Sequence, residues 1–168
     1  MAKGIKTHLF LLDDYRSFTG DVRKKFSDSS RYAIDSFQAK DEFLRKLASE
    51  RQSNACKIAV LGIHDPNGAD QLLSELRKAD AHSGIIFLCP PDKIEDARKN
   101  VNLNVDCFIP LNGNAILRIH NTVKKLFSEH YLNIYRKRRN RSLLALLAFI
   151  ILTGLAILIA SLKFPEYF

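Results

Sequence analysis

The sequence predicts an α/β fold, a doubly wound parallel sheet of the (βα)5 type, with a fifth helix that extends into a single transmembrane helix. Short apolar runs alternate along the chain with longer stretches in which apolar residues recur at helical spacing. Runs such as GIIFLC at 84–89 are apolar almost throughout, which is typical of parallel strands that helices cover on both faces. An uncharged stretch at 143–162 follows the alternating part and predicts the membrane span.

The alternation predicts five strands and four intervening helices. The expected strands are the apolar runs at 7–12, 32–37, 57–63, 85–89 and 107–109. The expected helices lie at 16–26, 40–50, 68–79 and 92–100. In the first of these helices, Phe18, Val22 and Phe26 recur every four residues and form one apolar stripe. One parallel sheet with helices on both faces buries all of these elements.

The fifth helix is expected to begin near Asn112, after Pro110, and no proline interrupts it before Pro165. One helix of about 50 residues is therefore expected, leading from a domain at 1–127 through a basic extension at 128–142 into the span. An aromatic and apolar stripe on this helix indicates either a protein contact or an interfacial aromatic belt, and its members are Phe127, Tyr131, Ile134 and Tyr135.

The predicted span at 143–162 contains no charge and no proline, and about 20 residues are needed to cross a bilayer as a helix. Five cations precede it, here called the basic collar: Arg136, Lys137, Arg138, Arg139 and Arg141. Only Lys163 and Glu166 follow, so the positive-inside rule places the N-terminal part in the cytoplasm and the tail at 163–168 outside. The predicted localisation is therefore the cytoplasmic (inner) membrane, with a single pass.

The formal net charge of +8 is spread unevenly along the chain. Five charges belong to the basic collar and Lys163 balances Glu166, which leaves +3 for residues 1–135. A nucleic-acid-binding domain usually has clustered basic residues in its folded part, so nucleic-acid binding is not expected of this domain. Binding of anionic lipid or nucleic acid through the collar is an alternative function.

The cysteines and histidines indicate no cofactor site. Cys56, Cys89 and Cys107 are far apart in the sequence, without the CxxC spacing of a metal or redox site, and are expected to be reduced core thiols. The five histidines lack metal-ligand spacing as well. We therefore expect no cofactor, no catalytic residue and no small-molecule substrate.

Four segments resemble the receiver domains of bacterial response regulators, which have a flavodoxin-like (βα)5 fold. HLFLLDDY at 8–15 is similar to the first strand with its acidic pair, and KIAVLGIHDPNGADQLLSEL at 57–76 to the third strand, the phosphoacceptor loop and the third helix. IIFLCPP at 85–91 and VDCFIPLN at 105–112 resemble the fourth and fifth strands. The resemblance covers about residues 5–127 and implies a divalent-cation site and an aspartyl phosphate beside the acidic pair.

The same resemblance indicates that this chain departs from the family in its polar pocket. It places Gly62 at the phosphoacceptor position, Cys89 in place of a Thr or Ser, and Pro110 in place of a lysine. Without a carboxylate nucleophile, the aspartyl phosphate cannot form at this position. The remaining carboxylates are only weak candidates for Mg²⁺ ligands, and no metal site is predicted from Asp13, Asp14 and Asp65.

Together these features predict a non-catalytic, membrane-anchored pseudo-receiver that acts as an adaptor or accessory subunit of an inner-membrane protein complex. The expected partners are membrane lipids and other integral membrane proteins, or a second copy of the chain. The span contains small residues that permit close approach of another helix, namely Gly154, Ala156 and Ala160. An alternative function is a phosphorylatable receiver in membrane-localised signalling that uses the displaced Asp65.

Overall fold

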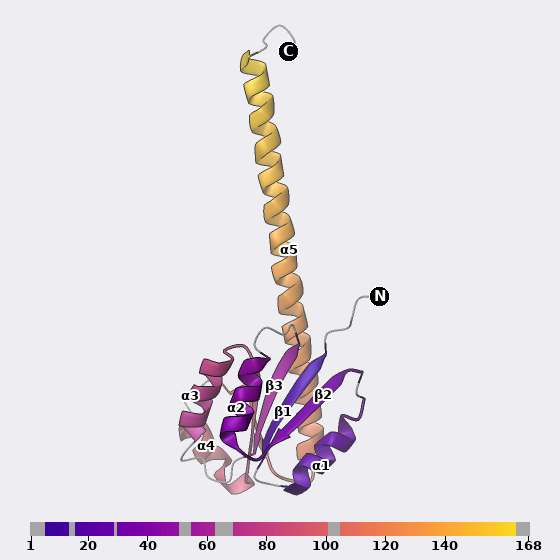
Figure 1. Ribbon diagram of the computed structural model, residues 1–168, viewed down its shortest axis with the longest axis vertical. Coiled ribbons are helices and arrows are strands. Elements are labelled where there is room, and N and C mark those ends of the chain that lie inside the picture. The colour runs from indigo at the N-terminus through magenta and orange to yellow at the C-terminus, as the bar shows by residue number, and fades with distance from the viewer. Residues whose placement is uncertain are drawn as a thin grey trace. The chain divides into compact units, whose positions relative to one another are not determined.

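A parallel five-stranded sheet with the strand order β2-β1-β3-β4-β5 lies at the centre of the N-terminal part of the chain (Figure 1). The computed structural model describes residues 6–13, 16–28, 30–50, 55–62, 69–100 and 105–163. The strands are β1 (Thr7–Asp13), β2 (Tyr32–Phe37), β3 (Cys56–Gly62), β4 (Gly84–Cys89) and β5 (Cys107–Pro110). This order is that of a flavodoxin-like doubly wound sheet, so the predicted class of this part is confirmed.

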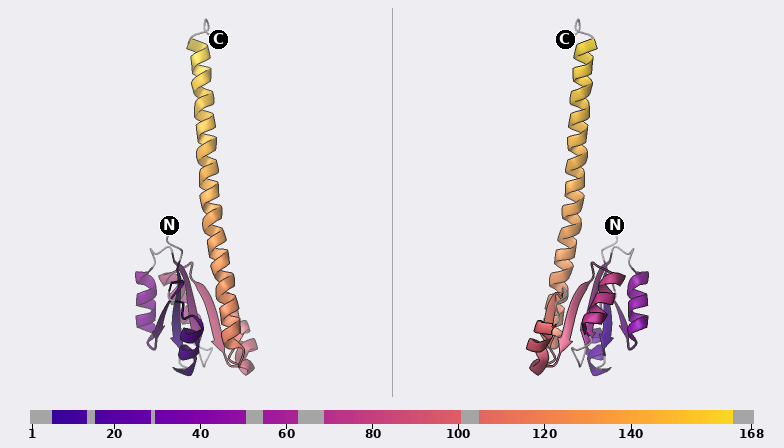
Figure 2. Two further views of the ribbon diagram at one scale, coloured as in Figure 1. Left: turned by 90° about the vertical axis from the view of Figure 1, so that its right-hand side faces the viewer. Right: turned by 90° about the vertical axis from the view of Figure 1, so that its left-hand side faces the viewer.

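Helices cover the sheet on both faces, and Figure 2 shows α2 and α5 on opposite sides of it. The helices are α1 (Arg16–Lys25), α2 (Lys40–Ser49), α3 (Ala69–Ala79), α4 (Ile94–Asn100) and α5 (Ala115–Lys163). Buried side chains of α2, α3 and α4 pack on one face, and those of α1 and the first turns of α5 pack on the other. Both faces of the parallel sheet are therefore buried, as such sheets require.

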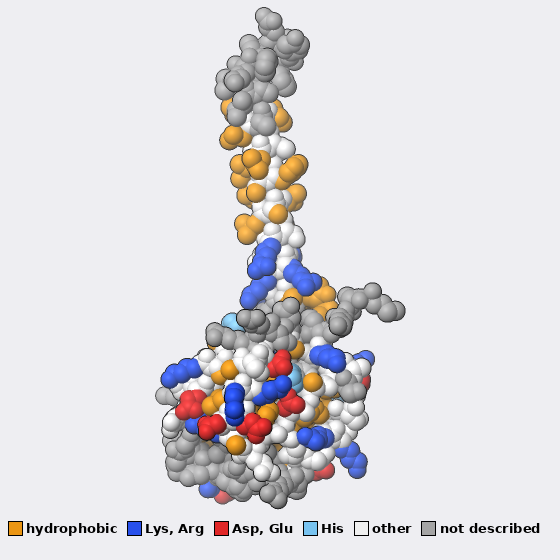
Figure 3. All heavy atoms as spheres, viewed as in Figure 1, with side chains coloured by type: hydrophobic (Ala, Val, Ile, Leu, Met, Phe, Trp, Pro, Cys, Tyr) orange, Lys and Arg blue, Asp and Glu red, His pale blue; other side chains and the backbone are white. Residues whose placement is uncertain are grey.

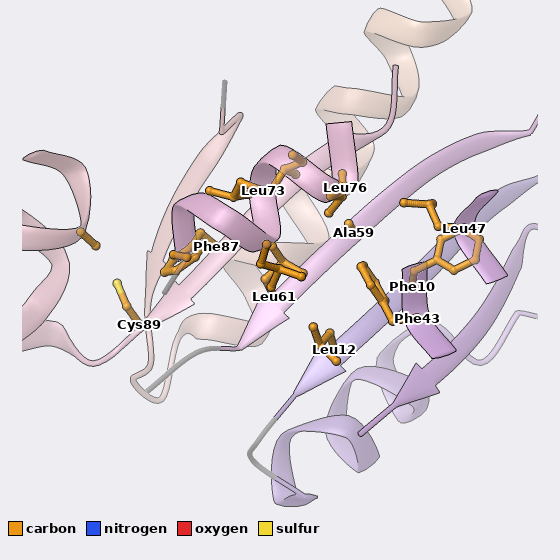
Figure 4. Packing of buried hydrophobic residues seen from close by; sticks show 14 residues of the cluster. Phe10, Leu12, Phe43, Leu47, Ala59, Leu61, Leu73, Leu76, Phe87 and Cys89 are labelled. Atoms are coloured by element: carbon orange, nitrogen blue, oxygen red, sulfur yellow. The ribbon is translucent and has the colours of Figure 1, made fainter. Parts of the chain in front are cut away.

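Alternate residues of each strand supply the two cores. Phe10, Ala59 and Phe87 point toward α2 and α3, where they meet apolar side chains of those helices (Figure 4). Their strand neighbours Leu9 and Val60 point to the opposite side, toward α1 and α5. Each large apolar side chain buried in this way contributes about 1.5–3 kcal/mol to folding, so the two cores account for the stability of the sheet.

The approach of α5 to the sheet is close at Gly84. A Cβ atom added there would lie 2.9 Å from Cδ1 of Leu126, a residue of α5. A glycine therefore lets this part of α5 pack directly on β4. Earlier in the same helix, Ile119 and Val123 are completely buried against the same face.

Two predicted helix starts differ from the observed ones. One helix was predicted at 92–100, but the structure has a short 3-10 turn, Pro91–Lys93, followed by α4 from Ile94. Pro90 and Pro91 lack N–H donors, which favours a short turn with few hydrogen bonds before the helix. α5 begins at Ala115 instead of near Asn112, because the Asn112 side chain accepts a hydrogen bond from the backbone N–H of Asn114 at 3.1 Å and holds a turn there.

The chain divides into two compact units, Met1–Ser128 and Glu129–Phe168. α5 contributes to both, since it is one helix of 49 residues. The predicted continuity of the fifth helix beyond the folded domain is therefore confirmed.

The predicted membrane anchor requires a correction. No helix in the described part of the chain is both long and apolar enough to cross a membrane. The side chains at 156 and 159–168, which include Ala156, Ala160 and the predicted tail, lie outside the described residues. This finding contradicts the predicted single-pass inner-membrane localisation, which is withdrawn.

Candidate functional site

The carboxyl ends of four parallel strands meet at one edge of the sheet, where the sequence predicted the receiver-like pocket. β1 ends at Asp13 and β3 at Gly62, and these two residues are register partners. β4 ends at Cys89 and β5 at Pro110, which are register partners as well. Gly62 also pairs with Leu88, so the four strand ends form one continuous row. Ligands of open α/β sheets bind at this edge.

Gly62 lies at the centre of this row and is buried. It is the last residue of a strand whose seven residues are all buried. A glycine offers neither a nucleophile nor a metal ligand from its side chain. The side chain at the end of β3 therefore can neither attack phosphorus nor coordinate a cation.

Cys89 is fully buried at the end of β4, in the core on the α2–α3 side. Burial raises the pKa of its thiol, and among the nearby charges Arg98 lowers this pKa and Asp92 raises it. The uncharged thiol is therefore the favoured form near neutral pH, and thiolate chemistry is not supported here. A thiol is also a weaker hydrogen-bond donor than the hydroxyl that the family resemblance implies at this position.

Pro110 ends β5 and supplies no cation to the edge. Its carbonyl oxygen accepts a hydrogen bond from the N–H of Asn112 at 3.0 Å, and the N–H of Leu111 donates to the carbonyl of Cys89 at 2.9 Å. These bonds tie the start of the β5–α5 turn to β4. The family resemblance implies a lysine at the position of Pro110. The positive charge of that lysine would have stabilised a phosphoryl group.

The weak metal candidates fall mostly outside what the structure describes. Asp14 and Asp65 are not among the described residues, and only the backbone of Asp13 is described. Among the residues that are described, no group of three His, Cys, Asp or Glu side chains is placed to hold a metal ion. The geometry thus adds no support for Mg²⁺ binding at this edge.

The candidate partner-contact residues of α5 differ in how far they are buried. Phe127 packs against the core on the α1–α5 side, within the N-terminal unit. In the second unit, Tyr131 and Tyr135 are both exposed, and their hydroxyl groups lie 2.6 Å apart. This hydrogen bond raises the pKa of Tyr131. Ile134 is partly buried, and Gly154 has no atoms near the position of a Cβ.

All five side chains of the basic collar are exposed. Figure 3 shows cations on the helix at this level and hydrophobic side chains beyond them. Large apolar residues from Leu143 to Leu158 are likewise exposed, each by more than half where its exposure is described. The arrangement places the charged segment next to the apolar one along one helix.

A second group of residues was missed by sequence reasoning. His120 of α5 stacks on Phe26, which directly follows α1, with ring centroids 5.2 Å apart. Burial lowers the pKa of His120, and the nearby Lys124 and Lys25 lower it further. Two lysines from different helices are therefore near enough to one imidazole ring to affect its charge. The run of cations at the end of α1, Arg23 to Lys25, was the available signal.

Comparison with solved structures finds the same fold in response-regulator receiver domains. The chain is similar to a receiver domain protein from Clostridium thermocellum, with 12% identity, a TM-score of 0.61, and coverage of 75% of this chain and 98% of that one. A CheY-like receiver domain protein from Methanospirillum hungatei gives 16% identity, a TM-score of 0.60, and coverage of 76% and 98%. An adenylate cyclase from Rhodopirellula baltica gives 14% identity, a TM-score of 0.64, and coverage of 82% and 98%.

No protein-family model and no curated protein matches the chain. The similarity to the solved structures therefore establishes a receiver-like, flavodoxin-like fold.

Proposed function

We propose that this chain is a non-catalytic receiver-like adaptor, which acts by binding proteins and does not accept a phosphoryl group. The observation that carries the proposal is Gly62, which ends β3 beside Asp13 at the edge where receiver-like sheets bind their ligands. The fold is present, but the side chain that would form the covalent intermediate is absent from this position.

The chemistry of phosphoryl transfer supports this interpretation. Such transfer depends on a nucleophile and on positive charge that stabilises the transferring group. At this edge the third strand ends in Gly62, the fourth in the buried thiol of Cys89, and the fifth in Pro110. The nucleophile, the hydroxyl group and the cation are therefore all missing from these three positions. None of the three strand ends supplies a group that could replace another's.

The rest of the domain favours a binding role. Both cores are filled by fully buried side chains such as Leu73 and Ile119, and the sheet retains the complete strand order. A rigid scaffold with an intact core can present surfaces to a partner without any chemistry of its own. Protein partners are therefore proposed, and a small-molecule substrate is not.

The experiment is incubation of the full chain with acetyl phosphate and Mg²⁺, followed by intact-mass measurement. We expect no adduct of about 80 Da, the mass of a phosphoryl group. A receiver domain with an aspartate at the end of its third strand serves as the positive control. An adduct that disappears in the Asp65→Asn variant would instead assign phosphorylation to the displaced aspartate, and any phosphoryl adduct on aspartate, labile as it is, would overturn the proposal.

A further inference from the structure

The helices on the two faces of the sheet differ in charge. Among the described side chains of α1 and of α5 up to Ser128, six are cations and one, Asp21, is a carboxylate. α2, α3 and α4 on the other face carry seven cations and six carboxylates. The six cations of the first group are Arg23, Lys24, Lys25, Arg118, Lys124 and Lys125. The α1–α5 side is therefore positively charged, and the helices of the opposite side are nearly neutral.

Ion pairing increases this difference. On the α2–α3 side, Lys40 Nζ lies 3.0 Å from the Glu75 carboxylate, and Lys46 Nζ lies 3.5 Å from that of Glu50. Within the described part of the chain, Lys25 and Lys124 have no carboxylate within 4.0 Å. Cations without a carboxylate partner leave a positive potential that attracts acidic groups and orients them.

The two lysines converge on one place. Lys25 ends α1 and immediately precedes Phe26, whose ring stacks on His120 at an interplanar angle of 26°. Lys124 follows His120 by four residues, so the two side chains are neighbours on the surface of α5. Both lysines lower the pKa of His120, as two nearby positive charges must. Cations from two helices therefore act on the same imidazole.

An exposed apolar side chain adjoins these cations. Leu117 is 54% exposed and lies three residues before His120 and seven before Lys124, on the same side of α5. Lys25, Leu117, His120 and Lys124 together are called the α1–α5 patch below. The patch combines positive charge with an apolar contact, as the binding surfaces for amphipathic helices do.

The composition of the α1–α5 patch favours an acidic protein over nucleic acid. Proteins that bind DNA commonly make about 6–10 phosphate contacts, and this patch offers two lysines. A partner with two or three carboxylates around an apolar side chain matches the patch in both charge and character.

We infer that the α1–α5 patch docks an acidic amphipathic segment of a partner protein, whose carboxylates pair with Lys25 and Lys124 and whose apolar side chains cover Leu117. The inference rests on the proposed adaptor function and names the chemistry of its partner. This surface lies away from the edge where the strands end, since Lys25 is at the end of α1 that leads into β2 and Lys124 lies in the third turn of α5.

The test is fluorescence anisotropy with the full chain and a labelled helical peptide of about 20 residues, built from glutamate and leucine with the leucines on one face. Reversal of both charges in Lys25→Glu/Lys124→Glu is expected to weaken binding about tenfold or more. The matched control Lys46→Glu/Lys78→Glu changes the net charge equally on the opposite face and is expected to change affinity by less than about twofold. Circular dichroism verifies that both variants are folded.

Three outcomes overturn the inference. Equal loss of binding in both reversal variants would show a general attraction of charge without a site. An unchanged affinity in Leu117→Ser would remove the apolar contact from the patch. Tighter binding of a short DNA duplex than of the peptide would assign the patch to nucleic acid. Any of these results leaves the proposed function intact, because that proposal is tested by the absence of a phosphoryl adduct.

Discussion

The buried ion pair between Lys57 and Asp80 gives the sharpest stability prediction. Their side chains are 8% and 6% exposed, and Lys57 Nζ lies 2.5 Å from Asp80 Oδ2, in an ion pair rather than a well-aligned hydrogen bond. Nζ also donates to the carbonyl of Glu50 at 3.0 Å. Asp80→Asn removes the carboxylate that pairs with this buried ammonium group, and breaking such a pair costs about 3–5 kcal/mol. The expected result is a large loss of stability with an unchanged fold.

Urea unfolding followed by circular dichroism measures this loss. With a slope of about 2 kcal/mol per molar urea, the midpoint should fall by about 1.5–2.5 M. The matched control is Glu75→Gln, which breaks the more exposed pair with Lys40 and should lower the midpoint far less. A midpoint for Asp80→Asn that equals that of the control would refute the reasoning. The double variant Lys57→Met/Asp80→Leu should recover most of the loss, because neither charge then remains buried alone.

Three further predictions follow from burial and charge. Leu73→Ala should lower the unfolding free energy by about 2–5 kcal/mol in urea titrations, whereas Leu117→Ala, at an exposed site, should change it by less than about 0.5 kcal/mol. In iodoacetamide labelling followed by mass spectrometry, the half-buried Cys107 should react before Cys56, because burial raises the pKa of Cys56 to about 12. The pKa of His120 is lowered in the folded state, so on acidification the unfolded chain binds a proton at this position first and is favoured. Between about pH 7 and pH 5.5 the wild type should therefore lose more thermal stability than the His120→Gln variant.

Most of the sheet could be predicted because its strands are buried on both faces. All seven residues of β3 are buried, and a short run that is apolar almost throughout is typical of such a strand. The strand was predicted at 57–63 and is observed at Cys56–Gly62, so each end agrees within one residue. The helix starts were less predictable, because they depend on single hydrogen bonds. The Asn112 side chain moves the start of α5, and no periodicity in the sequence reports that bond.

The strand-end row was predictable for a related reason. Parallel strands bring their carboxyl ends to one edge, so Asp13, Gly62, Cys89 and Pro110 were expected to meet, and the register places them in one row. The α1–α5 patch was not predictable from counting charges. A net charge of +3 along residues 1–135 says nothing about which face carries it, and only the fold brings Lys25 beside His120.

The predicted membrane span was wrong. The uncharged stretch at 143–162 suggested a helix that crosses a bilayer. In the described part of the chain, however, no helix is both long and apolar enough to do so. The structure does show that the basic collar and the large apolar side chains from Leu143 to Leu158 are exposed where they are described.

The central claim is that this receiver-like domain works through a binding surface and not through chemistry at its strand ends. Amide chemical shifts of the ¹⁵N-labelled full chain test both halves of the claim in one titration series. On addition of acetyl phosphate and Mg²⁺ the signal of Gly62 should stay in place, and on addition of the acidic peptide the signals of Lys25 and His120 should move. Movement of Gly62 with the phosphodonor, together with an unchanged His120 in the presence of peptide, would contradict the claim.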